Sequence, residues 1–339
     1  MKTYQNGEIY FIRETEYPSK LISSFVKIGL VHYSEGRDSY GRLSEHQTGN
    51  PRRLILDDSH IVKTQAVDMV EAQLHRRFAT SRISGEWFEL LGEKELGEAI
   101  SEAKKLAALV DSYMPKFEEA IQLGNTESNG NIRPGTNDEI EWATRLVTAR
   151  KQSSVCADVE GEIKAFISKS VSEGNDPGVA AKNSLRTYKP KFDEKDFREK
   201  HMDLWDRYQK SVKSWDSALK PAFRAQSLGS EFEASIDELK RSLAEVTASK
   251  NYTEIVEMNL VLTNLKGLAD WEAKVSEAEL KSLIGLDEQV TGVATWKRGY
   301  KATEKFDEAT FAEDNPDLYK SFIYTPAPTT LVNLKKSKG

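Results

Sequence analysis

Apolar residues up to Leu91 follow two periodicities, first that of strands and then that of a helix. Residues 9–12 (Ile-Tyr-Phe-Ile) and 25–30 (Phe-Val-Lys-Ile-Gly-Leu) are rich in β-branched and aromatic side chains, which predicts two strands. The segment between them is too short for a crossover helix, so the strands are expected to pair antiparallel. From Thr64 apolar residues recur every three or four positions, which predicts an amphipathic helix. Further strands are predicted at 53–56, 60–62 and 85–90.

Beyond Gly92 the apolar spacing is mainly that of helices. Residues 93–123 are expected to form a helical extension in which Pro115 breaks or kinks the helix. Residues 124–137 carry Ile132 as their one bulky apolar side chain and are interpreted as a linker. Residues 138–339 are predicted to be mainly helical, with a small hairpin around Arg298-Gly299. One bulky stripe at helical spacing would pack in a bundle or against a second copy of the chain: Phe197, Leu204, Trp205, Tyr208, Val212, Trp215 and Leu219.

Length, composition and charge narrow the class of protein. The 339 residues suggest two or three domains, and 38% hydrophobic with 30% charged residues exclude a wholly disordered chain. No apolar run approaches the ~20 residues that cross a bilayer, and the N-terminus lacks the apolar core of a signal peptide. A single cysteine, Cys156, fits a reducing compartment, so a cytoplasmic location is expected. Because the net charge is −6, contact with nucleic acid requires a local basic face.

Familiar hydrolase motifs are missing, but basic side chains cluster in the first unit. The chain has no Walker-type loop and no HExxH, paired CxxC or Gly-x-Ser-x-Gly motif. Four of the five histidines lie in the first unit among arginines: His32, His46, His60 and His75 beside Arg37, Arg42, Arg52, Arg53, Arg76, Arg77 and Arg82. Such clustering indicates a phosphate ligand, although a solvated basic face without a partner has the same composition.

Four stretches together resemble the GIY-YIG nuclease superfamily, in particular a phage and bacterial subgroup whose second motif begins with lysine. In chain order they are Glu8–Ile12, Val26–Leu30, Arg42–Pro51, and Glu71–Phe78 running on to Gly85–Phe88, within residues of about 7–91. The first motif reads Glu-Ile-Tyr where the family usually has Gly-Ile-Tyr. Ile83 and Ser84 lie where several related enzymes carry an asparagine. The resemblance implies a small α+β nuclease domain with a central antiparallel sheet at residues 1–92.

The resemblance also implies roles for five side chains. Glu71 would hold a single Mg²⁺ or Mn²⁺ ion, because a hard cation can take one protein carboxylate and fill its other positions with water and phosphate. Arg42 would bind the scissile phosphate and stabilise its developing negative charge. Tyr10 would orient or deprotonate the attacking water, with Lys27 supplying the positive charge that lowers the pKa of the phenol. His46, one helical turn after Arg42, would relay a proton or contact the phosphate.

These residues predict a divalent-metal-dependent endonuclease that hydrolyses DNA. The helical region would select the target, bind a protein partner or pair with a second copy of the chain. The basic side chains expected to contact DNA are Arg37, Arg52, Arg53, Arg76 and Arg77. Two alternatives stay open: a catalytically inactive module that binds nucleic acid, and a helical scaffold or adaptor protein.

Overall fold

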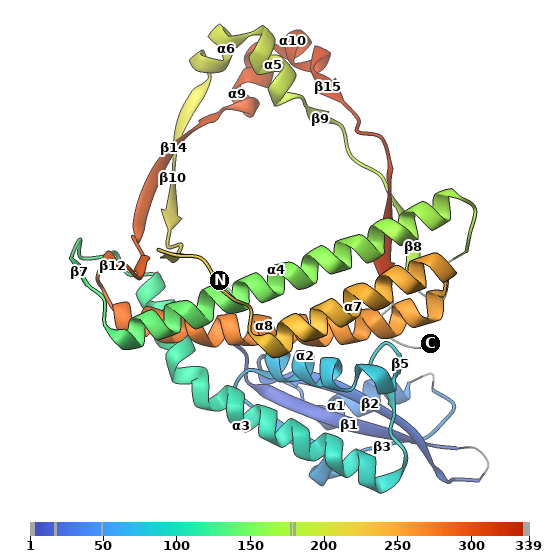
Figure 1. Ribbon diagram of the computed structural model, residues 1–339. Coiled ribbons are helices and arrows are strands. Elements are labelled where there is room, and N and C mark those ends of the chain that lie inside the picture. The colour runs from blue at the N-terminus through green and yellow to red at the C-terminus, as the bar shows by residue number, and fades with distance from the viewer. Residues whose placement is uncertain (1–3, 17–18, 49, 177, 179–180, 335–339) are drawn as a thin grey trace.

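The computed structural model describes residues 4–16, 19–48, 50–176, 178 and 181–334. The chain forms an N-terminal α+β domain, a platform of long helices, and two β-ribbons that join this platform to a small helical cap (Figure 1). The predicted α+β fold, with an N-terminal antiparallel sheet followed by a mainly helical region, is confirmed. No helix within the described ranges is long and apolar enough to span a membrane.

Strand β1 (Gly7–Thr15) is the centre of the N-terminal sheet. It pairs antiparallel with β2 (Ile22–His32), β3 (Leu54–Ile55) and β4 (Ile61–Thr64), while β6 (Trp87–Glu89) pairs with β2 and with β5 (Arg82–Ser84). Residues 7–14 of β1 are all buried, because both faces of the sheet are covered. The strands predicted from residues 9 to 90 are each represented in this sheet.

Different helices cover the two faces of the sheet. Ile9 and Phe11 pack in one core with α2 (Val67–Arg77) and α3 (Gly92–Gly124). Tyr10 and Ile12 project to the opposite face, since neighbouring residues of a strand alternate. There they pack with Leu43 of α1 (Ser39–Gln47). The helix predicted after Thr64 is therefore α2, and it lies between the sheet and the platform (Figure 1).

Helix α3 continues through Pro115, so of the two expectations for this proline, a break or a kink, the break is wrong. Met114 and Phe117, on either side of the proline, are both buried in the core shared with the sheet. A proline inside a helix costs about 3 kcal/mol, and burial of apolar side chains along the length of α3 outweighs that cost.

Three helices form the platform: α4 (Asn137–Ser172), α7 (Ser230–Ser249) and α8 (Tyr252–Ile284). They lie side by side and share a hydrophobic core (Figure 1). A capping box begins α4, because the Thr136 side chain accepts from the Glu139 N–H while the Glu139 carboxylate accepts from the Thr136 N–H. Arg133 also holds this carboxylate and reaches Asp287 beyond the end of α8. The start of α4 and the end of α8 are thereby tied together at one end of the platform (Figure 1).

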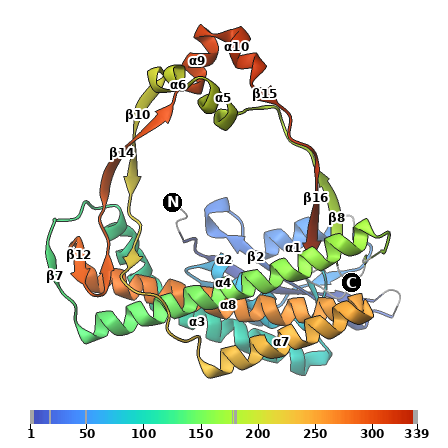
Figure 2. The same ribbon diagram turned by 45° about the horizontal axis from the view of Figure 1, so that its top comes forward.

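Two β-ribbons rise from the platform and meet at the cap (Figure 2). In one ribbon, β10 (Gln209–Asp216) pairs with β14 (Gly299–Phe306). In the other ribbon, β8 (Ala181–Arg186) pairs with β16 (Thr329–Leu334). This second ribbon continues toward the cap, where β9 (Lys191–Phe192) pairs with β15 (Ile323–Tyr324). The cap contains α5 (Glu194–Lys200), α6 (Met202–Arg207), α9 (Glu308–Asp314) and α10 (Pro316–Ser321). Its core is aromatic and separate from the others.

The cap is built from two copies of one sequence motif. Residues 192–208 read FDEKDFREKHMDLWDRY and residues 306–322 read FDEATFAEDNPDLYKSF. The equivalent Phe197 and Phe311 are both fully buried, with ring centres 4.6 Å apart. The strand before each copy pairs with the strand after the other copy, as β9 does with β15 and β14 with β10. The repeat therefore joins the two ribbons in a pseudo-twofold arrangement.

Two expectations for the C-terminal half are wrong. Residues 209–216 form strand β10, so the stripe that includes Val212 and Trp215 spans several elements rather than one helix. The hairpin expected around Arg298-Gly299 does not form, because β14 pairs with β10. Instead, β13 (Ala294–Thr295) lies between β11 (Lys220–Pro221) and β12 (Gln289–Thr291). Apolar spacing alone cannot show which distant strand supplies the hydrogen bonds of an exposed ribbon.

The segment interpreted as a linker is part of a sheet. Its strand β7 (Ile132–Pro134) pairs parallel with β12. Residues before it are also fixed, since the Ser128 N–H donates to the carbonyl of Arg298. Main-chain hydrogen bonds therefore order this polar segment, which composition alone does not predict.

Replacing Phe311 with alanine is expected to open the cap and leave the N-terminal domain intact, because Phe311 belongs to a separate aromatic core. Loss of a buried phenylalanine side chain costs about 3 to 5 kcal/mol. Amide hydrogen exchange should accelerate in residues 192–208 and 306–322 and stay unchanged in β1. The exposed Met202→Ala is the matched control. Equal loss of protection in β1 would contradict a separate cap core.

Candidate active site at the open edge of strand β2

One edge of the N-terminal sheet collects the polar side chains singled out in the sequence. Strand β6 pairs with β2 only at residues 25–27, and among the described residues no strand continues along that edge. The main chain of Ile28 is satisfied differently: its N–H donates to the Glu86 carbonyl at 3.0 Å, and its carbonyl lies 2.9 Å from His75 Nε2. Side chains from α1 and α2 can therefore meet at this edge although the helices cover opposite faces.

Tyr10 reaches the edge by crossing over Gly29. The two residues are directly paired between β1 and β2, so their side-chain positions share one face of the sheet. A Cβ atom at position 29 would stand 2.5 Å from the Tyr10 hydroxyl oxygen, which is closer than real contacts allow. Glycine is therefore required at position 29 for the phenol to lie where it does.

The Tyr10 hydroxyl lies against two side chains of α1. Its oxygen is 3.2 Å from Nε2 of His46. Burial and the negative charge of Glu86 raise the pKa of Tyr10 to about 12, and the nearby Arg42 guanidinium only partly opposes this. Burial, together with the positive charges of Lys27 and Arg42, lowers the pKa of His46. At neutral pH the pair is a neutral phenol beside a neutral imidazole.

Lys27 forms an ion pair with Glu86, and this changes the role expected for the lysine. Lys27 lies in β2 opposite Ile12, while Glu86 follows Gly85 in the turn between β5 and β6. Gly85 adopts a positive φ of 57°, which favours glycine. The Lys27 charge is compensated by Glu86, and the carboxylate raises the pKa of Tyr10. The expectation that Lys27 lowers the pKa of the phenol is therefore wrong.

Glu71 projects from α2 toward the same charges. Burial, followed by the negative charges of Glu86 and Asp68, raises its pKa to about 7, while Lys27 and Arg82 oppose that shift. Its charge also contributes to the raised pKa of Tyr10, so the two groups are electrostatically coupled. Within the part of the chain that the structure describes, no hydrogen bond or ion pair occupies the Glu71 carboxylate.

These acidic groups fit a weakly held, hard cation better than a closed metal centre. No group of three or more His, Cys, Asp or Glu side chains arranged for a metal occurs among the described residues. Glu71 and Glu86 are coupled carboxylates, and Mg²⁺ commonly takes one or two carboxylates, with water and substrate phosphate completing its shell. The unpartnered Glu71 carboxylate is the group best suited to such an ion.

Glu86 belongs to the site, although its position in the sequence predicts only the start of the closing strand, next to Trp87 and Phe88. The sequence signal was the motif Gly85-Glu86, in which glycine allows a tight turn and the following acidic residue lies at the strand start. Its partner Lys27 is distant in sequence, so the ion pair could not be read from spacing.

The arginines expected to contact DNA fall into two groups. Arg37 pairs with Glu35 and Glu45, Arg52 pairs with Glu14 at 2.5 Å, and Arg53 is exposed next to it. These three lie near α1 and the strand after it. Arg77, by contrast, is paired with Glu102 of α3, and the Arg76 guanidinium lies against Gly267 of α8. Arg76 and Arg77 thus contact the chain's own helices.

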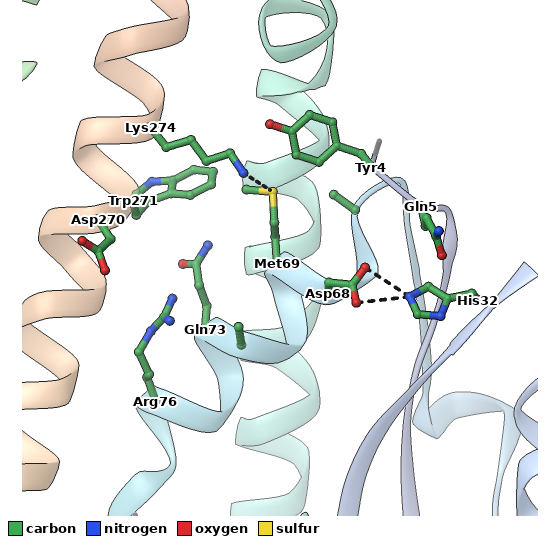
Figure 3. A pocket seen from close by; sticks show the side chains of 12 residues that line it. Tyr4, Gln5, His32, Asp68, Met69, Gln73, Arg76, Asp270, Trp271 and Lys274 are labelled. Atoms are coloured by element: carbon green, nitrogen blue, oxygen red, sulfur yellow. Dashed lines mark hydrogen bonds and ion pairs between the residues drawn. The ribbon is translucent and has the colours of Figure 1, made fainter. Parts of the chain in front are cut away.

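A cavity of about 610 Å³ separates α2 from α8 on the side of the domain that faces the platform (Figure 3). Arg76 and Met69 line it from α2, and Trp271 and Lys274 line it from α8. Lys274 Nζ contacts the Met69 sulfur at 3.3 Å. Figure 3 also shows His32 held by Asp68 at its rim. None of Tyr10, Lys27, Arg42, His46 or Glu71 lines this cavity, so it is distinct from the site at the edge of β2.

Comparison with known families indicates which kind of domain the N-terminal part of the chain forms. Residues 7–104 match the model of the T5orf172 domain family, a GIY-YIG-like domain of the endonuclease type. The match covers the whole sheet, α1, α2 and the beginning of α3, and it contains every residue of the candidate site. No curated protein and no solved structure matches the chain.

The raised pKa of Glu71 makes stability depend on pH in a defined direction. Between its ordinary value of 4.5 and the folded value of about 7, the folded chain holds a proton that the unfolded chain releases, so stability falls as pH rises. Glu71→Gln should therefore be more stable than the unaltered protein at about pH 8, by about 1 to 2 kcal/mol since the carboxyl is partly solvated, and equally stable near pH 4.

Urea unfolding without divalent cations at both pH values measures this difference. The exposed Glu98→Gln, on α3, is the matched control and should show no pH-dependent gain. If Glu71→Gln were less stable than the unaltered protein at the higher pH, this would contradict the claim that burial disfavours the charged form of the Glu71 carboxyl.

Proposed function

We propose that the N-terminal domain is a divalent-metal-dependent endonuclease that hydrolyses phosphodiester bonds of DNA, and that the helical region selects the target or a partner. The observation that carries this proposal is the convergence of Tyr10, Lys27, Arg42, His46 and Glu71 at one open sheet edge. They come from two strands and two helices. An ordinary solvated basic face would not bring a buried phenol, a neutral imidazole and an unpaired carboxylate together.

His46 is the general base in this proposal. Its imidazole is neutral at pH 7, whereas a phenol with a pKa of about 12 does not release its proton. Tyr10 orients the attacking water through its hydroxyl, which lies at hydrogen-bond distance from Nε2 of His46. As the water oxygen bonds to phosphorus, its proton passes to the imidazole. The bond from phosphorus to the leaving oxygen breaks, and that oxygen keeps the electron pair and takes up a proton from solvent.

Arg42 of α1 supplies the positive charge that binds the phosphate in this proposal. Arg42 is partly exposed, and its pairing with Glu45 at 2.7 Å orients the guanidinium while leaving donors for a phosphate oxygen. Glu71 would hold Mg²⁺ or Mn²⁺, with Glu86 as the adjacent carboxylate. When bound, such a cation supplies Lewis-acid stabilisation of phosphoryl charge. Glu86 would thus take the place of the asparagine that several related enzymes carry, and its pairing with Lys27 fixes its orientation.

Plasmid cleavage by the purified full-length protein with Mg²⁺ tests this function. Glu71→Gln and Arg42→Ala should each lower the rate by roughly 10² to 10³, the cost of removing one group that stabilises transition-state charge. Glu98→Gln and Arg241→Ala are the matched controls, because both residues are exposed on other helices. Cleavage that persists at the unaltered rate in both site variants would remove these residues from the mechanism.

A binding module without cleavage is the second candidate. The compensation of Lys27 by Glu86 favours it, since the Arg42 guanidinium only partly opposes the raised pKa of Tyr10. Such a module would bind DNA with a steep salt dependence, would lose affinity evenly on substitution of Arg52 or Arg53, and would release no cut product with either cation.

A further inference from the structure

The ribbon formed by β10 and β14 is uncovered on both faces. None of its residues is buried, although the two strands pair over their full length. An isolated two-stranded ribbon is at best marginally stable in water. Here its two ends are held, because Phe306 enters the cap core and the Trp215 indole N–H donates to the Gly124 carbonyl at 2.8 Å. The ribbon is thus presented to solvent as a fixed, extended element.

Both ribbons are basic in a chain whose net charge is −6. Residues 181–192 contain four lysine or arginine residues and no acidic one, and the paired segment 323–334 has no charged residue. The strands β10 and β14 together contain four lysines against two acidic residues. Both ribbons therefore carry a net positive charge, and only the platform end of the β8–β16 ribbon packs against a hydrophobic core.

The register places three lysines on one face of the β10–β14 ribbon. Lys210 lies directly opposite Lys305, and Lys301 lies opposite Ser214 on the same face. Like charges that face each other across a ribbon destabilise it, so an anionic partner would stabilise this arrangement. Lys210 is paired with Asp307 at 2.6 Å, whereas no ion pair involves Lys301 or Lys305 within the described chain.

We propose that the two ribbons are a second DNA-contacting surface, which holds the phosphate backbone of a duplex away from the cutting site. A two-stranded ribbon is of the right size to enter the major groove. Lysine, a point charge on a flexible stem, suits phosphate contacts rather than base recognition. Lys301 and Lys305 span about 13 Å along β14, close to the rise of about four nucleotides of one strand. The ribbons therefore add affinity without sequence selectivity.

The choice of DNA as the partner rests on the proposed function, but the surface is separate from the site. The exposed cations used below lie on β14, at the last residue of β8 and on the segment after β8, and none belongs to the N-terminal domain. Binding can therefore be measured in full-length Glu71→Gln protein with EDTA, where no cutting occurs. Failure of cleavage and failure of ribbon binding are then observed independently.

Fluorescence anisotropy of a labelled 30-base-pair duplex, titrated between about 50 and about 200 mM salt, tests the proposal. Lys301→Gln combined with Lys305→Gln should weaken binding and reduce the slope of log K against log salt by about 1.8, since each phosphate contact contributes about 0.9. Arg186→Gln combined with Lys189→Gln should act similarly on the other ribbon.

The control is Lys240→Gln combined with Arg241→Gln, which removes the same charge from exposed positions of α7. It should leave the slope unchanged. Thermal unfolding of each variant should match that of the unaltered protein, because all the substituted side chains are exposed. Slopes of both ribbon variants equal to that of the control, or tighter binding to a duplex RNA of the same sequence, would overturn the proposal.

Discussion

The candidate site depends on one structural constraint, the early end of pairing between β6 and β2. Beyond Lys27 the edge of β2 is completed by the Glu86 carbonyl and the His75 ring instead of by another strand. Exposed sheet edges are usually blocked or charged, and here the Glu86 carbonyl and the His75 ring block the edge next to the candidate site. The ion pair of Lys27 with Glu86 lies at the point where the two strands separate.

This constraint explains how helices on opposite faces of a sheet serve one site. Tyr10 crosses over Gly29 from the face of α1, and Glu71 lies on α2, where it is electrostatically coupled to Tyr10 and Glu86. Glu71 and His46 are buried because side chains from both helices crowd this edge of the sheet. The same burial raises the pKa of Glu71 and lowers that of His46.

The sequence predicted the N-terminal sheet well because its strands are dense in β-branched and aromatic residues and its helix α2 has a clear period. The order of the motifs along the chain carried the family resemblance, and that resemblance pointed to side chains that the structure brings to one edge of the sheet. The sequence could not show that Glu86 neutralises Lys27, because burial and ion pairing depend on contacts between distant residues. In the C-terminal half, Val212 and Trp215 lie at helical spacing by chance, although they belong to a strand. The partner of that strand could not be predicted, because the pairing of β10 with β14 joins segments far apart in the chain.

The pKa of the Glu71 carboxyl, followed by ¹³C NMR with and without Mg²⁺, tests the central claim most directly, and Glu71→Gln identifies the signal. The account predicts a pKa near 7 without the cation. With Mg²⁺ it should fall by about one unit or more, because a bound cation stabilises the carboxylate. A carboxyl that titrates at its ordinary value without Mg²⁺, or whose titration does not move when Mg²⁺ is added, would contradict the account.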